Sequence, residues 1–108
     1  MNLISLIRRK YVELTFRRYD LRIVEAIGAQ QFEHIIQVYR NSGWEITDAY
    51  QAFSPDADRW RCKLRKGTSV LECEWQHQRF GSISGPARII NALANEFKLV
   101  VLEFPTWQ

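Results

Sequence analysis

The sequence has few of the residues that build metal centres or disulfide frameworks: two cysteines and two histidines among 108 residues. The two thiols show no Cys-x-x-Cys spacing, and no histidine pair completes a ligand set, so we expect no bound metal. The sequence also contains no nucleotide-binding loop, so we expect no other cofactor. With 46% apolar and 13% aromatic residues, a chain of this length buries enough surface to fold without a metal or a disulfide. We expect one globular domain spanning 1–108.

Long apolar runs are also missing. The longest, Leu99–Leu102 and the interrupted Leu3–Ile7, are far shorter than the roughly 20 residues that a membrane-spanning helix needs. The charges Arg8, Arg9 and Lys10 follow the first run, which is the reverse of the order in a signal peptide. We therefore expect a cytoplasmic protein with no membrane partner.

Neither sign of charge dominates. Fifteen Lys and Arg oppose twelve Asp and Glu, which gives a net charge of +3. The cations are spread along the whole sequence, whereas dedicated nucleic-acid domains concentrate theirs. The balance allows an anionic partner but does not require one.

The most informative segment that is present is 59–76, which alternates apolar and charged residues around Gly67-Thr68. Glycine in the first position of a two-residue loop is typical of a type II′ hairpin turn. That turn fixes which residues face each other, and a slip by one residue would scramble both faces. The register places three apolar pairs on one face, Trp60–Trp75, Cys62–Cys73 and Leu64–Leu71. On the other face it places two pairs of opposite charge, Arg61–Glu74 and Lys63–Glu72.

Two segments have the apolar spacing of amphipathic helices. The first, over 29–42, is followed by Gly43, which suits the left-handed residue after a helix. The second, over 86–97, begins with Pro86, a residue that fits the first helical position. Their apolar stripes are Phe32, Ile35, Ile36 and Tyr39 in the first helix and Ile89, Ile90, Leu93, Ala94 and Phe97 in the second.

The remaining segments predict strands and turns. Strands are expected over 21–27, 44–53 and 99–104, and the last is apolar on both sides, as in a central or covered strand. The Gly- and Ser-rich residues 80–86 predict a loop that leads into the second helix. The turn cluster at 54–56 ends the strand that precedes the hairpin.

The first 20 residues are ambiguous. Leu3, Leu6 and Ile7 have helical spacing, but Tyr11–Phe16 alternates with period two and is rich in strand-forming residues. A strand over 11–17 is therefore preferred. The segment could pack in its own domain, or form an N-terminal extension or a swapped strand.

These elements predict an α+β fold. We expect a mixed or antiparallel sheet of five to six strands with two helices packed on one face. The order is loosely ferredoxin-like with an added hairpin strand, an analogy that says nothing about activity.

Several side chains are candidates for a binding site. Arg59 and Arg61 belong to a basic stripe that phosphates could contact, although a solvated face paired with Glu72 and Glu74 is the preferred interpretation. Cys62 and Cys73 are predicted to be reduced core thiols rather than a disulfide.

Residues 81–86 could also cradle an anion. A Gly-Ser-rich turn that opens a helix presents free backbone N–H groups, and we expect Arg79, Ser82, Ser84 and Arg88 to gather there. The preferred interpretation is an ordinary capping turn.

The aromatic residues suggest a second kind of surface. Trp44, Tyr50, Trp60 and Trp75 could stack the bases of single-stranded nucleic acid if they were exposed. The two helices need an apolar sheet face to pack on, so burial in the core is preferred.

Catalytic candidates are few. Glu25 and Asp48 each interrupt an apolar alternation, and if both pointed inward they would form a desolvated carboxylate pair suited to acid–base chemistry. A sheet bulge or an edge position would instead expose them. His77 and His34 are single histidines with no predicted partner.

The leading functional hypothesis is a small non-enzymatic protein, expected to be a homodimer, that recognises a protein partner or a small ligand. Toxin-neutralising and other small bacterial accessory proteins share this composition. The alternatives are single-stranded nucleic-acid binding through the Arg-rich hairpin and a small enzyme that uses Glu25 and Asp48 or His77.

Overall fold

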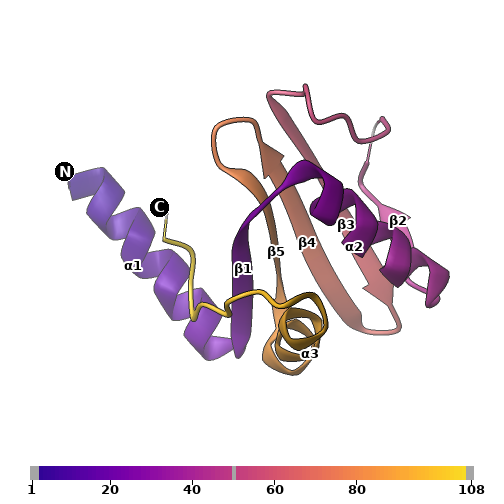
Figure 1. Cartoon of the computed structure of the whole chain (residues 1–108). Coiled ribbons are helices and arrows are strands. Elements are labelled where there is room, and N and C mark those ends of the chain that lie inside the picture. Colours follow the sequence, from indigo (N-terminus) through magenta and orange to yellow (C-terminus); the bar gives the residue numbers. More distant parts are fainter. Residues whose placement is uncertain (1–2, 50, 107–108) are drawn as a thin grey trace.

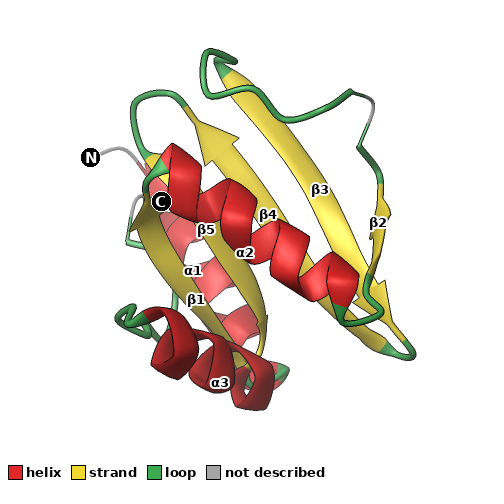
Figure 2. Cartoon of the chain, turned by 45° about the vertical axis from the view of Figure 1, so that its right-hand side comes forward, coloured by secondary structure: helices red, strands yellow, loops and turns green. Residues whose placement is uncertain are grey.

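The computed structural model describes residues 3–49 and 51–106 and shows an α+β fold (Figure 1). Its five-stranded antiparallel sheet has the strand order β1-β5-β4-β3-β2. Helices α2 and α3 cover one face of the sheet, and α1 lies on the opposite side beside β1 (Figure 2). The elements are α1 (Leu3–Arg18), β1 (Leu21–Ile27), α2 (Ala29–Asn41), β2 (Glu45–Thr47), β3 (Arg59–Lys66), β4 (Ser69–Gln76), β5 (Phe80–Pro86) and α3 (Ala87–Phe97).

The predicted fold class is confirmed: the sheet has five strands, and two helices pack on one of its faces. The likeness to a ferredoxin-like topology is loose. Strands β2 to β5 follow one another without an intervening helix, and the strand pairs of the described sheet are all antiparallel.

The hairpin forms in the predicted register. Trp60 faces Trp75, Cys62 faces Cys73, and the remaining pairs follow the same rule through β3 and β4. Gly67 has φ +62°, whereas Thr68 is not among the residues with positive φ. A positive φ at only the first loop residue is the signature of a type II′ turn, so the predicted turn is confirmed.

The core lies between the sheet and the two helices, and it is centred on Phe32 of α2. The centroid of the Phe32 ring lies 5.3 Å from that of Phe53 and 6.1 Å from that of Trp60, and both pairs are edge to face. The indole Nε1 of Trp60 donates to the Gln51 carbonyl at 2.8 Å, and that of Trp75 donates to the Ala57 carbonyl at 3.2 Å. The hairpin tryptophans are therefore buried with their polar atoms satisfied, as the core interpretation predicts.

The strand predicted over 11–17 is wrong, because this segment belongs to helix α1. The apolar spacing of Leu3 and Ile7 continues through Leu14, and this helical period outweighs the short alternation in 11–16. The helix contacts β1 of the same chain and presents its half-buried residues, including Val12 and Phe16, on that side.

The loop predicted over 80–86 is also wrong, because these residues form strand β5 between β1 and β4. The glycines there do not serve a turn. A Cβ on Gly81 would lie 2.3 Å from the Phe32 ring, and one on Gly85 would lie 2.6 Å from Leu71. Glycine is needed because neighbouring side chains occupy the space that a Cβ would fill.

Two predicted strands are shorter than expected. In 44–53 only Glu45–Thr47 pairs, and it ends before Asp48, whose φ is +59°; Tyr50 lies outside the described residues. In 99–104 a single bridge between Ile23 and Leu102 joins the segment to β1. The apolar residues of the second segment therefore lie along the edge of β1 and do not form a central strand.

Candidate functional site

The structure does not bring Glu25 and Asp48 together. Glu25 lies on β1 and Asp48 follows β2, and these strands are the two opposite edges of the sheet. Four strand spacings of about 4.8 Å separate them by roughly 19 Å. A bulge between Val24 and Ile27 turns Glu25 out of the alternation, and Asp48 is exposed at an edge. The inward-facing carboxylate pair is therefore not formed.

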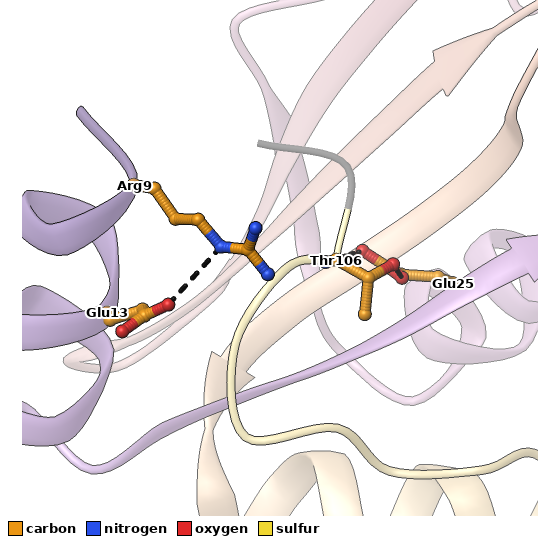
Figure 3. A network of polar contacts seen from close by, with 4 residues as sticks. All are labelled: Arg9, Glu13, Glu25 and Thr106. Atoms are coloured by element: carbon orange, nitrogen blue, oxygen red, sulfur yellow. Dashed lines mark hydrogen bonds and ion pairs between the residues drawn. The ribbon is translucent and has the colours of Figure 1, made fainter. Parts of the chain in front are cut away.

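Glu25 has a structural partner instead. Its carboxylate accepts hydrogen bonds from the Thr106 backbone N–H at 3.1 Å and from the Thr106 hydroxyl at 2.6 Å. Figure 3 shows Arg9 of α1 extending its guanidinium toward this point while its Nε lies 3.4 Å from Glu13. Glu25 thus fastens the C-terminal segment where it passes between β1 and α1.

In the described part of the chain, the two histidines make no hydrogen bond or ion pair with Glu25 or Asp48, and each has a different neighbour. His77 is exposed in the turn between β4 and β5, where its backbone N–H donates to the Asp58 carbonyl at 3.0 Å. His34 is exposed on α2, with its ring edge to face against Phe97 at 5.9 Å.

The anion cradle expected at 81–86 is not formed. Ser82 and Ser84 lie within β5, opposite Glu74 and Glu72 of β4. Arg79 precedes β5 and Arg88 follows it, so the length of a seven-residue strand, roughly 20 Å, separates them. The first N–H of α3, at Ala87, donates to the Asp20 carbonyl at 2.9 Å. The chain itself therefore satisfies the first N–H of this helix.

The two cysteines are free and buried, which confirms the prediction of reduced core thiols. A hydrogen bond with Cys62 and the surrounding burial raise the pKa of the Cys73 thiol well above its usual value. A thiol held in its protonated form is a poor nucleophile and a poor metal ligand. Within residues 3–49 and 51–106, no group of three or more side chains is placed to hold a metal ion.

The outer face of the hairpin is an open polar surface. It carries Arg59, Arg61 and Lys63 of β3 beside Glu72 and Glu74 of β4, and we call these five residues the outer patch. Helices α2 and α3 lie on the opposite side of the sheet and leave this patch uncovered (Figure 2).

The charges of the outer patch are less paired than the sequence predicts. Arg61 faces Glu74 and Lys63 faces Glu72 in the register, but in the described part of the chain no ion pair joins either couple. Lys63 lies instead 3.6 Å from Asp48. Arg59 and Arg61 make no hydrogen bond or ion pair with any described residue. Their guanidinium groups are available to a partner.

Two hollows adjoin these arginines. One of about 420 Å³ is lined by seven residues of the hairpin and the loop before it: Gln51, Arg59, Trp60, Arg61, Glu74, Trp75 and Gln76. A second, of about 330 Å³, lies on the other side of Arg61 and extends along Lys63 and Glu72 to Asp48. Of the candidate binding residues, the structure thus brings Arg59 and Arg61 to one surface. Ser82 and Ser84 lie on the neighbouring strand β5, opposite Glu74 and Glu72, and Arg79 lines a small hollow with Ser82 and Glu74. Arg88 lies apart from them, on α3.

Sequence reasoning missed a second surface, on α1. Across Leu3–Arg18, all of it described, no residue is buried, and several large apolar side chains face water. The signal that could have revealed this surface is the spacing of Ile4, Ile7, Tyr11 and Leu14, which follows a heptad pattern. The preferred strand over 11–17 concealed it.

Among the described helices, none combines the length and the apolar character required to cross a membrane.

No protein family model, curated protein or solved structure matches this chain. Function must therefore be inferred from the surfaces themselves.

Proposed function

We propose that this chain is a small non-enzymatic binding protein whose outer patch recognises an anionic group, a carboxylate or a phosphate, on a protein partner or small ligand. The observation that carries the proposal is the pair Arg59 and Arg61. Both line the hollow of about 420 Å³, and neither is paired with a described residue. A guanidinium offers a rigid fork of donors that matches an oxyanion bidentately.

The carboxylates of the patch refine the expected ligand. Glu74 borders both hollows beside Arg61, and Glu72 borders the second. A purely anionic ligand would be repelled by them, whereas an extended peptide of mixed charge could place its acidic groups on the arginines and its basic groups on the glutamates. A protein segment therefore fits the patch better than a free polyanion.

A binding role has more support than a catalytic one. The only carboxylate pair that the sequence offered for acid–base chemistry is divided between opposite edges of the sheet. The thiol of Cys73 is buried and held protonated. The arginines, by contrast, lie on a surface that a partner can reach.

Single-stranded nucleic acid has less support as the partner. Base stacking requires exposed aromatic rings next to the cations. Trp60 and Trp75 border the hollow but are only 7% and 3% exposed, and Trp44 packs against Tyr39 with ring centroids 5.6 Å apart. The outer patch therefore offers cations without a stacking platform.

The test is calorimetric titration of the full chain with a six-residue peptide of alternating Glu and Lys, at low salt. We expect binding, and we expect the double variant Arg59→Gln, Arg61→Gln to bind at least tenfold more weakly, because each charge-assisted hydrogen bond contributes about 1.5–3 kcal/mol. The matched control is Arg88→Gln, which removes an exposed cation from α3 and should bind as the unmodified chain does.

Three outcomes would overturn the proposal. The first is no heat of binding with the peptide at millimolar concentration. The second is an equal loss of binding in the double variant and in the Arg88→Gln control. The third is tighter binding of a single-stranded oligonucleotide than of the peptide at the same salt concentration, which would favour the nucleic-acid alternative.

A further inference from the structure

Helix α1 exposes far more apolar surface than any other element. Six of its large side chains are between 45% and 71% exposed, namely Leu3, Ile4, Leu6, Ile7, Tyr11 and Leu14. Together they leave on the order of 600 Å² of largely apolar surface in water, at the upper end of the largest patch on a typical monomer. Such a patch marks an interaction surface.

Four of these apolar side chains form a continuous seam along one side of the helix. Ile4, Ile7, Tyr11 and Leu14 are spaced three, four and three residues apart, so they occupy successive a and d positions of a heptad repeat. The residues of α1 that touch the rest of the chain lie on the other side: Val12 and Phe16 are half-buried. The seam therefore faces away from the sheet that α1 contacts.

The area of the seam suits a second copy of the same helix. Four of the six exposed side chains lie in the seam and Leu3 flanks it, so two seams brought together bury on the order of 1,000 Å² in total, which is the minimum for a specific interface. A two-fold dimer uses the same patch on both chains, so the patch must be self-complementary, and an a/d seam is. The helix is also already ordered against β1, which lowers the entropic cost of pairing.

The charges beside the seam select the relative direction of the two helices. In an antiparallel pair the centre of the seam would place Lys10 beside Lys10 of the second copy and Arg8 beside Arg8 of the second copy. In a parallel pair Lys10 lies beside Thr15 of the second copy, and Arg8 lies beside Leu3 of the second copy. The parallel arrangement avoids both contacts between like charges.

We infer that two copies of this chain form a parallel dimer through the α1 seam, with Ile4, Ile7, Tyr11 and Leu14 at its centre. The inference does not depend on the proposed function, because the seam and the outer patch lie on different elements. Each chain of the dimer would keep its own outer patch, so a partner with two acidic segments would bind more tightly than a partner with one.

The test is the mass of the full chain by analytical ultracentrifugation between 1 and 200 µM protein, concentrations of the order at which interfaces of this size associate. The expected mass is twice the 12.8 kDa of one chain. The double variant Ile7→Asp, Leu14→Asp should be monomeric over the same range, with a dissociation constant raised about a hundredfold or more.

Two controls separate dimerisation from folding and from general exposure. Neither substituted side chain is buried, so the circular dichroism spectrum of the variant should stay that of the unmodified chain. The matched variant Phe80→Asp, Val100→Asp changes two side chains that lie outside α1 and are 51% and 76% exposed. It should remain a dimer.

Cross-linking tests the direction of the helices. Leu14→Cys should oxidise to a disulfide-linked dimer, because a parallel pair places position 14 beside its own copy. The native thiols are buried and do not compete. A disulfide that forms only when Leu14→Cys and Ile4→Cys chains are mixed would overturn the parallel arrangement.

Two results would overturn the inference as a whole. One is a monomer at 200 µM; if that monomer also co-sediments with vesicles containing phosphatidylglycerol, the seam and its flanking cations belong to an anionic lipid surface. The other is a dimer that persists in the Ile7→Asp, Leu14→Asp variant.

Discussion

At the scale of single residues, the chemistry of Cys73 is set by its surroundings. Its thiol is fully enclosed and shares a hydrogen bond with Cys62, and both effects favour the protonated form. The unfolded chain provides neither effect. The folded state therefore holds the Cys73 proton more tightly than the unfolded state does, and stability becomes linked to pH.

We predict that the free energy of unfolding falls as the pH rises above 9.0, the ordinary pKa of the thiol. Above that pH the unfolded chain loses the proton and the folded chain keeps it, so each pH unit lowers the free energy of unfolding by about 1.4 kcal/mol until the raised pKa is reached. Tyr39, whose pKa is raised by burial and then by Glu96, adds to the fall only above about pH 10.

Urea unfolding at pH 7, 9 and 10 measures this dependence. The matched variant Cys73→Ala lacks the buried thiol, so its stability should change less between pH 9 and 10 than that of the unmodified chain. Equal slopes in the two proteins would show that Cys73 is not the group responsible.

We predict that Glu25 contributes to the stability of the folded chain and that Asp48 contributes little. Removing the Glu25 carboxylate in Glu25→Ala leaves the Thr106 N–H and hydroxyl without their acceptor, which should cost about 1 kcal/mol. Asp48→Asn breaks only an exposed ion pair with Lys63 and keeps a residue type that tolerates positive φ, so it should change stability by less than about 0.5 kcal/mol. Denaturation midpoints compare the two, and equal losses would contradict this difference.

At the scale of elements, β5 fits under α2 because its glycines have no Cβ atom. Phe32, the centre of the core, occupies the position where a side chain at Gly81 would begin. The strand can lie between β1 and β4 only because its glycines let neighbouring side chains approach its backbone.

Gly81→Ala is therefore predicted to lower the free energy of unfolding by about 2–3 kcal/mol, because the new Cβ forces the Phe32 ring out of its place. Gly28→Ala is the matched control: a Cβ there meets nothing within 4 Å, and the change should stay within about 1 kcal/mol. Thermal or urea unfolding measures both. A Gly81→Ala variant as stable as the control would contradict the packing described.

The hairpin and the two core helices were predictable from the sequence because local and long-range signals agree there. Gly67 permits the turn, and the pairing of Trp60 with Trp75 and of Arg61 with Glu74 favours the same register. Helix α2 was predictable for the same reason: one apolar stripe matches one buried face.

The errors arose where one residue type serves two purposes. Gly81 and Gly85 resemble turn residues, but their role is close packing, which only the position of Phe32 and Leu71 reveals. In α1 the alternation of 11–16 imitates a strand, and only the whole helix shows the competing heptad spacing. The outer patch was predictable in position but not in pairing, because Lys63 reaches Asp48 on the next strand.

At the scale of the whole molecule, the chain separates a dry core from two different outward surfaces. The outer patch on β3 and β4 is charged and hollowed, whereas the α1 seam is apolar and lies beside β1, toward the opposite edge of the sheet (Figure 1). A charged patch suits a reversible contact with a partner, and an apolar seam suits a lasting one between copies. This division supports a protein that binds rather than transforms its ligand.

The measurement that tests binding on the outer patch most directly is an NMR map of backbone amide shifts during titration of the full chain with the mixed-charge peptide. Binding on the outer patch predicts that the amides of Arg59, Arg61 and Glu74 shift most, while those of α1 and of residues 86–97 stay in place. Shifts centred on Arg88, or on α1, would contradict the account.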